Sequence, residues 1–294
     1  MVSRARAARL KPLLDAVADD RPWADRVRFD PVEFPHRYEA PRDVEVVALL
    51  SASLAYGRAD LFKPKIESVL EKLGARPAAR LKALEVSQLA GLLDGFVYRF
   101  NLPADVGVLL MGMGACLRTH GSLEATFLEA RRTSPDYRAA LSTFARTVRD
   151  AAPRAEIVRA LGPTRGLDHL LPVGDGAAKR LSLYLRWMVR GPDAIDFGIW
   201  TLVKPAELVI PLDTHIARLS TFLGLTTRQT RGWAMAEEIT ASLRQLAPDD
   251  PVRYDFSLCH FGMSGACPAR PVEASCRRCP LKAECRVGRK LVRR

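Results

Sequence analysis

The chain has 294 residues, more than one average domain, and 48% of them are hydrophobic, which suffices for a sizeable core and excludes a disordered chain. The formal net charge of +12 at pH 7 favours a polyanionic partner, either nucleic acid or an anionic membrane surface. The most apolar stretch, residues 46–56, is far shorter than the roughly 20 residues that cross a bilayer. No signal peptide opens the chain, so we expect a cytoplasmic protein without a membrane partner.

Glycine and proline divide the chain into segments whose apolar residues recur at helical spacing, and no sustained alternation predicts a sheet. The expected helices span 41–56, 64–73 with Pro64 in the first turn, 106–117, 123–130, 137–150, about 177–190, 214–223 after Asp213, 233–246 and roughly 252–262. Residues 191–211 and the tail from Cys267 onward are expected to be irregular. The predicted fold class is all-α, with a core of two lobes and a cleft between them over residues 1–265 and a separate tail over 266–294.

Four of the six cysteines gather in that tail, with the spacing Cys267-x8-Cys276-x2-Cys279-x5-Cys285. Disulfides are rare in the cytoplasm, and four thiolates this close in sequence are the ligand set of a [4Fe–4S] cluster. Structural zinc is the main alternative, although it usually takes two C-x2-C-like pairs and only one is present. The other two cysteines, Cys116 and Cys259, lie on helical stripes and are predicted to be small buried hydrophobes.

The tail also resembles a known family. The segments Leu258-Cys259-His260-Phe261-Gly262, Cys276-Arg277-Arg278-Cys279-Pro280 and Glu284-Cys285 are similar to the end of endonuclease III and the adenine glycosylase MutY, members of the helix–hairpin–helix DNA glycosylase superfamily. Their loop has the spacing C-x6-C-x2-C-x5-C, so the first interval is two residues longer here. In that family the cluster braces a loop that contacts the DNA backbone. By this resemblance Arg270, Arg277 and Arg278 are phosphate contacts; otherwise they only keep the tail in solution.

A second stretch, Ile210-Pro211-Leu212-Asp213-Thr214-His215-Ile216-Ala217-Arg218, resembles the segment that carries the essential aspartate of this superfamily. The resemblance implies that Asp213 is the catalytic carboxylate. It would stabilise the oxocarbenium-like sugar as the base departs and activate a nucleophile at C1′. An aspartate at a helix boundary also commonly caps the helix, and the two roles are compatible.

The segment Leu171-Pro172-Val173-Gly174-Asp175-Gly176-Ala177-Ala178 resembles the hairpin motif L-P-G-V-G-x-x-T-A, in which backbone N–H groups bind a DNA phosphate. Gly174 and Gly176 are the candidate contacts. The motif's lysine position falls on Ala177 or Ala178, which makes the nearby Lys179 the candidate nucleophile. A desolvated lysine amine can attack C1′ to form a Schiff base and permit strand cleavage. The alternative is a surface lysine on a DNA-facing helix.

The chain further resembles an uncharacterised bacterial family of unknown function within this superfamily, over 38–58, 98–100, 179–190 and 250–256. A glycosylase must flip out its target base and fill the hole that is left. In endonuclease III a glutamine follows L-S-A in the first buried helix. Here Leu50-Ser51-Ala52 leads to Tyr56-Gly57-Arg58, and Tyr56 and Arg58 are the candidate wedges, or else residues that pack at a helix end.

Together these resemblances imply a monomeric DNA N-glycosylase that excises a damaged or mispaired base from double-stranded DNA, with AP lyase activity if Lys179 is the nucleophile. The alternative is a non-catalytic DNA-binding protein that carries an iron–sulfur cluster or zinc. The resemblances do not imply which lesion is removed, because base discrimination depends on pocket shape.

Overall fold

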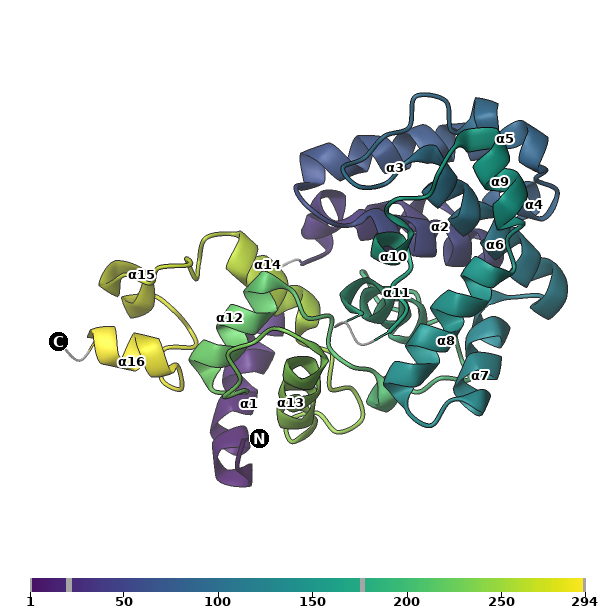
Figure 1. Ribbon diagram of the computed structural model, residues 1–294. Helices are drawn as coiled ribbons and strands as arrows, with labels where there is room; N and C mark the ends of the chain where they lie inside the picture. The colour runs from purple at the N-terminus through teal and green to yellow at the C-terminus, as the bar shows by residue number, and fades with distance from the viewer. Residues whose placement is uncertain (1, 20–22, 175–177, 293–294) are drawn as a thin grey trace. The chain divides into compact units, whose positions relative to one another are not determined.

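A computed structural model of the chain describes residues 2–19, 23–174 and 178–292. These residues form helices and loops (Figure 1), and the only β-type pairing among them is an isolated bridge between Tyr98 and Asn101. The predicted all-α class is therefore confirmed. No helix in the described ranges is long and apolar enough to cross a membrane.

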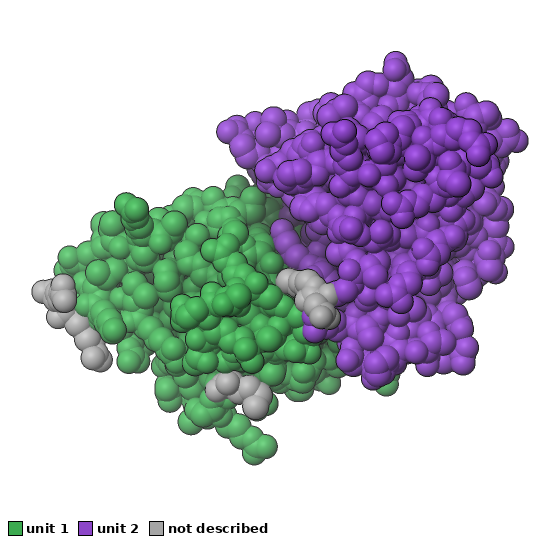
Figure 2. All heavy atoms as spheres, in the orientation of Figure 1, with its two compact units in different colours: residues 1–26, 193–195, 204–294 green, residues 27–192, 196–203 purple. Residues whose placement is uncertain are grey.

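The chain divides into two compact units, coloured separately in Figure 2. Unit 1 comprises Met1–Arg26, Asp193–Ile195 and Lys204–Arg294, and unit 2 comprises Val27–Pro192 and Asp196–Val203. This division differs from the one expected at residues 265/266. The cysteine tail belongs to unit 1 because the helix at Arg286–Val292 packs against the one at Thr214–Leu223, and because Arg9 of the N-terminal helix donates a hydrogen bond to Glu284.

Unit 2 is built from ten α-helices among its described residues. They are α2 Pro41–Leu54, α3 Ala59–Leu73, α4 Pro77–Lys82, α5 Val86–Leu92, α6 Pro103–His120, α7 Leu123–Thr133, α8 Tyr137–Asp150, α9 Arg154–Leu161, α10 Leu167–Leu170 and α11 Lys179–Val189; short 3-10 helices precede them at Trp23–Phe29, which begins in unit 1, and at Pro31–Glu33 and Pro35–Arg37.

Helix α6 lies at the centre of unit 2 and packs against α4, α7, α8 and α9. Two of its glycines permit the closest of these approaches. A Cβ on Gly112 would lie 1.9 Å from the Val148 carbonyl oxygen on α8, and one on Gly114 would lie 2.2 Å from the Leu81 carbonyl oxygen on α4. The helices can therefore meet backbone to backbone at these two positions.

Helix α2 carries a buried carboxylate that ties unit 2 together. Glu45 is fully buried and accepts hydrogen bonds from Trp200 Nε1 at 2.8 Å and from the backbone N–H of Glu124 at 3.1 Å. Burial raises the pKa of Glu45, against the opposing effect of Arg42. Helix α2 also packs against α11 and ends two residues before Tyr56, which fixes the position of that side chain.

Unit 1 contains six α-helices in its described residues. They are α1 Arg4–Asp19, α12 Thr214–Leu223, α13 Trp233–Arg244, α14 Asp255–Met263, α15 Glu273–Arg277 and α16 Arg286–Val292, with a 3-10 helix at Pro205–Glu207. Helix α12 packs against α14 and α16, and α1 packs against α14. Helix α12 is therefore the element that connects the segment carrying Asp213 to the cysteine tail.

Several elements differ from the sequence-based expectation, and the short helices α4, α5, α9 and α10 were not predicted. Helix α3 begins at Ala59, so Pro64 lies inside the helix rather than in its first turn. The tail was predicted to be irregular, but α15 and α16 form in it. Helix α1 was not predicted, because its arginines obscure a stripe of buried residues: Ala7, Leu10, Leu14 and Val17.

Candidate functional site

Asp213 is the N-cap residue of α12. It follows the buried segment Ile210–Leu212, and its Oδ1 accepts a hydrogen bond from the backbone N–H of Ile216 at 2.6 Å. An N-terminal carboxylate interacts favourably with the helix dipole and with the free N–H groups of the first turn. The expected capping role is therefore present, and it holds the half-buried carboxylate of Asp213 in one orientation.

The second oxygen of Asp213 contacts a cysteine from another helix. Cys259 lies on α14, and its Sγ donates to Asp213 Oδ2 at 3.1 Å. Cys259 is half-buried rather than a buried small hydrophobe, so the prediction for this residue is wrong. Cys116, in contrast, is buried on α6, and desolvation raises the pKa of its thiol to about 11. The Asp213 contact could not be predicted, since it joins residues from two helices.

Arg218, one turn further along α12, links this helix to the start of the cysteine tail. Its Nη2 donates to the Cys267 carbonyl oxygen at 2.8 Å and lies 3.2 Å from His215 Nδ1. The close packing of α12 on α14 depends on Gly262, where a Cβ would lie 2.8 Å from His215 Nδ1. Arg218 thus fixes the backbone of Cys267 relative to Asp213's helix.

The four tail cysteines, Cys267, Cys276, Cys279 and Cys285, line one pocket. Its walls also include Phe222, Pro268, Pro271 and Val287, and no aspartate, glutamate or histidine is among the lining residues. This donor set is entirely soft, which suits iron–sulfur clusters and zinc and does not suit magnesium or calcium. In the described part of the chain, however, no three His, Cys, Asp or Glu side chains are grouped closely enough to hold a metal ion as they stand.

The thiols of this pocket influence one another's ionisation. Burial raises the pKa of Cys267 to about 11, with further increases from Cys279, Cys285 and Cys276 and an opposing effect of Arg218. Burial also raises the pKa of Cys276 and of Cys279, in both cases with a contribution from Cys285. The pocket therefore favours the neutral, protonated thiol at Cys267, Cys276 and Cys279.

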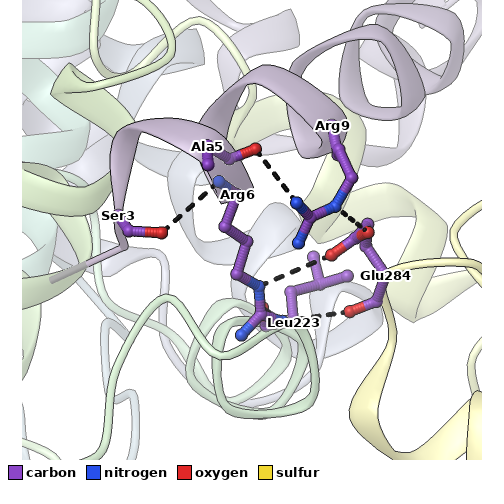
Figure 3. Close-up of polar contacts among 6 residues, drawn as sticks. All are labelled: Ser3, Ala5, Arg6, Arg9, Leu223 and Glu284. Atoms are coloured by element: carbon purple, nitrogen blue, oxygen red, sulfur yellow. Dashed lines mark hydrogen bonds and ion pairs between the residues drawn. The ribbon is translucent and has the colours of Figure 1, made fainter.

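The N-terminal helix is hydrogen-bonded to Glu284, the residue before the last of these cysteines (Figure 3). Glu284 is buried, and its Oε1 accepts from Arg9 Nε at 2.7 Å while its Oε2 lies 3.6 Å from Arg6 Nε. Arg6 Nη2 also donates to the carbonyl oxygens of Leu223 at 2.7 Å and Glu284 at 3.1 Å. We call this set of contacts the arginine clamp. It joins α1, the end of α12 and the residue before Cys285, and sequence reasoning missed it.

The basic residues predicted in the tail differ in their surroundings. Arg270 and Arg278 are exposed, and their side chains make no hydrogen bond or ion pair with any described residue. Arg277 is also exposed, but it pairs with Glu273 one turn earlier in α15. Arg270 and Arg278 are thus free to contact a phosphate, whereas Arg277 would first have to leave its partner.

The remaining candidates lie in unit 2. Arg58 is exposed and pairs with Asp60. Gly174 has a φ of 114°, and its N–H donates to Ser142 Oγ at 3.0 Å. This backbone donor of the predicted hairpin therefore already has a partner. Gly176 lies outside the described residues. Lys179 is half-buried at the first position of α11. It belongs to unit 2, whereas Asp213 belongs to unit 1.

Tyr56 is packed rather than extended into solvent. Its hydroxyl donates to Asn101 Oδ1 at 2.5 Å and lies 3.0 Å from the Tyr98 carbonyl oxygen. Its ring meets the His169 ring edge to face, with 4.2 Å between centroids. Desolvation raises the pKa of Tyr56 well above its usual value. These contacts favour the packing alternative over a wedge that must enter the DNA stack.

Comparison with known sequences identifies one family. The family described as "Protein of unknown function (DUF2400)" matches residues 30–264. The match includes the stretches 38–58, 98–100, 179–190 and 250–256, contains Asp213 and Lys179, and ends before Cys267. Helix α1 and the cysteine tail, which the arginine clamp joins, both lie outside it. No curated protein and no solved structure matches the chain significantly.

Proposed function

The chain belongs to this family of unknown function, and we propose that it is a DNA-repair glycosylase of the helix–hairpin–helix type that excises a damaged or mispaired base from double-stranded DNA. One observation carries the proposal. A single helix, α12, has Asp213 as its N-cap and is held through Arg218 and Arg6 to the tail that bears the four-cysteine pocket. The net charge of +12 suits a polyanionic partner.

Asp213 would act on the sugar. Its carboxylate, oriented by the Ile216 N–H, would stabilise positive charge at C1′ as the glycosidic bond breaks, and would accept a proton from the attacking nucleophile. In the lyase version of the reaction, the Lys179 amine attacks C1′ and the base departs with the bonding electrons. The C1′–O4′ bond then breaks, O4′ takes up the proton that the attacking amine has lost, and the lysine nitrogen is left in an imine with C1′. Loss of a C2′ proton from this imine permits β-elimination of the 3′ phosphate.

The cysteine pocket would hold a [4Fe–4S] cluster through Cys267, Cys276, Cys279 and Cys285. The all-thiol donor set fits such a cluster, and the bound cluster would supply a rigid centre for the tail rather than a reaction step. Arg270 and Arg278, both exposed, would then contact the DNA backbone. A zinc site is the alternative for the same four thiols.

A non-catalytic DNA-binding function is the second candidate, and a specific contact favours it. Both carboxylate oxygens of Asp213 already have partners, the Ile216 N–H and the Cys259 thiol. A carboxylate used only to cap α12 and to join it to α14 would have the same contacts. Catalysis requires that the Cys259 contact give way to the substrate.

A panel of duplex oligonucleotides, each with one lesion or mismatch, tests the proposal with the wild type and Asp213→Asn. Asparagine also caps helices well, so we expect the variant to keep its melting temperature and to lose at least about 100-fold in the single-turnover rate of base release. Borohydride trapping on abasic DNA, compared between the wild type and Lys179→Gln, tests the lyase step. If the wild type releases no base from any duplex, the protein is not a glycosylase for those lesions and the binding function is preferred.

A further inference from the structure

Arg180, the second residue of α11, is a half-buried cation without a carboxylate partner. Its Nη1 lies 3.1 Å from His169 Nε2, and its Cζ lies 5.2 Å from the centroid of the Tyr56 ring. Its Nε is buried and makes no hydrogen bond. Burial lowers the pKa of Arg180 to about 10. A charge that is partly removed from water and is neither paired nor fully hydrogen-bonded is unfavourable in the folded protein.

The other two arginines in this part of the chain, unlike Arg180, have a carboxylate partner. Arg186 is fully buried and its guanidinium donates to Asp196 Oδ1 from Nε at 3.1 Å and from Nη2 at 2.9 Å. Arg190, which follows the helix, pairs with Asp196 as well. Asp196 thus pairs with both of these arginines, whereas no carboxylate pairs with Arg180.

The nearby carboxylates are committed elsewhere. Asp168 is next to His169 in sequence, but it pairs with Arg149 at 2.6 Å. Asp105 accepts hydrogen bonds from the backbone N–H groups of Leu102, Arg165 and Gly166 at 2.8 to 3.0 Å. Neither can neutralise Arg180 without breaking these contacts.

The surroundings of Arg180 add positive rather than negative charge. Arg99 is exposed, has a φ of 52°, and places its Cζ 5.9 Å from the same Tyr56 ring. Burial lowers the pKa of His169 to about 4, with further lowering by Arg180 and then Arg99, so the ring is neutral at pH 7. Its Nε2 can then accept from Arg180 and hold the guanidinium in place.

We propose that Arg180, held by His169 and Tyr56 and assisted by Arg99, binds a phosphate group. A guanidinium offers several N–H donors in a fixed planar arrangement that matches phosphate oxygens. The position at the start of an 11-residue helix adds the favourable end of the helix dipole. On the proposed function, on which this choice of source rests, the phosphate is a phosphodiester of the bound DNA strand.

The test compares Arg180→Met with Arg132→Gln in the full chain. Arg132 lies on the surface of unit 2 and pairs with Glu129 at 2.7 Å, which makes it a control for loss of one positive charge. With a lesion-free labelled duplex in fluorescence anisotropy, Arg180→Met is expected to weaken binding about tenfold and to reduce the slope of log Kd against log salt by about one. Arg132→Gln is expected to change the Kd by less than about twofold. Equal DNA affinities of the wild type and Arg180→Met would show that the phosphate bound by Arg180 is not a phosphodiester of DNA.

Thermal unfolding separates binding from packing. Methionine keeps the length of the arginine stem without the charge, so Arg180→Met is expected to melt no lower than the wild type. Sodium phosphate should raise the wild-type melting temperature relative to sodium chloride of equal ionic strength, and this increase should be absent in Arg180→Met. A large fall in melting temperature together with a retained response to phosphate would show that Arg180 only supports the fold. If Arg180→Met does not fold, Arg180→Lys, which keeps the charge but not the planar donor array, serves in both assays and is expected to retain part of each effect.

Two further comparisons assign the phosphate to its source. Oligonucleotides with and without a 5′-phosphate distinguish a terminal phosphomonoester from an internal phosphodiester. A site for an internal phosphodiester should bind both oligonucleotides equally, whereas a site for a terminal phosphomonoester should bind the phosphorylated one more tightly. A response to inorganic phosphate without any effect of Arg180→Met on DNA affinity would assign the site to free phosphate and contradict the DNA assignment. If no duplex of the lesion panel is cut but DNA affinity still depends on Arg180, the glycosylase proposal fails and the phosphate site stands.

Discussion

The pKa of His169 depends on the side chains that surround it. It lies against Tyr56, meets the exposed ring of Phe100 with 5.4 Å between centroids, and accepts from Arg180. Burial and the two nearby arginines lower its pKa from 6.5 to about 4. Since a protonated imidazole would place a third cation in this cluster, the folded protein resists protonation that the unfolded chain allows.

This difference predicts a pH dependence of stability. Above about pH 6.5 His169 is neutral in both states and contributes nothing. As the pH falls from 6.5 towards 4, the unfolded chain binds a proton that the folded chain does not, so the wild type loses stability. His169→Gln, which keeps an acceptor for Arg180, should lack this part of the loss. We expect the difference between the two free energies of unfolding to change by ~1 kcal/mol over that range, less than the full linkage value because water screens the half-buried ring. Urea unfolding of both proteins at several pH values measures it, and parallel profiles would contradict the assignment.

At the scale of helices, the arginine clamp predicts that α1 stabilises the tail. Arg6→Met removes the bonds to the Leu223 and Glu284 carbonyl oxygens, so the backbone on either side of Cys285 should open more often. We expect amide hydrogen exchange in residues 281–288 to accelerate about tenfold, which corresponds to ~1.4 kcal/mol of lost protection. Arg4→Gln is the control, because Arg4 is an exposed residue of the same helix without a described partner. Equal exchange in the two variants would mean that the clamp contributes nothing to the tail.

The helices were predictable from sequence to the extent that their apolar residues recur along one segment. The periodicity around Val106 and Leu117 and the aspartate before α12 indicate α6 and α12 correctly. The interior position of Pro64 in α3 was missed, because packing of the helix overrides the local preference of proline. The clamp and the pairing of Cys259 with Asp213 join residues that are distant in sequence, so no local pattern indicates them.

The same limit applies to the candidate sites. The cysteine spacing predicted that Cys267 and Cys285 would lie close together, and they line one pocket. The special position of Arg180 depends on where Asp168 and Asp196 find their partners. A sequence reveals which residues are charged, but only the fold determines which charges remain uncompensated.

At the scale of the whole molecule, the chain passes between its two units several times, yet each unit has its own buried core. The four-cysteine pocket and the arginine clamp belong to unit 1, whereas the tightly packed α6 with its glycine contacts belongs to unit 2. A centre bound by the tail should therefore stabilise unit 1 directly and leave the interior of unit 2 unchanged.

Replacement of Cys279 by alanine tests this expectation together with the identity of the centre. The wild type, purified without oxygen, should be brown with broad visible absorbance if the pocket holds an iron–sulfur cluster, and colourless if it holds zinc. Cys279→Ala should lose the absorbance and the bound iron, and amide protection should fall in the tail, in α1 and at the end of α12, while α6 and α8 keep theirs.

Cys116→Ala provides the matched control, since this thiol is buried on α6 in unit 2. It should keep the absorbance and the iron, and its small cavity should destabilise unit 2 by about 1 kcal/mol. A colourless wild type with four-thiolate zinc would replace the cluster by a zinc site without changing the role of the pocket. Loss of protection in α6 on removal of Cys279 would instead mean that the two units unfold as one.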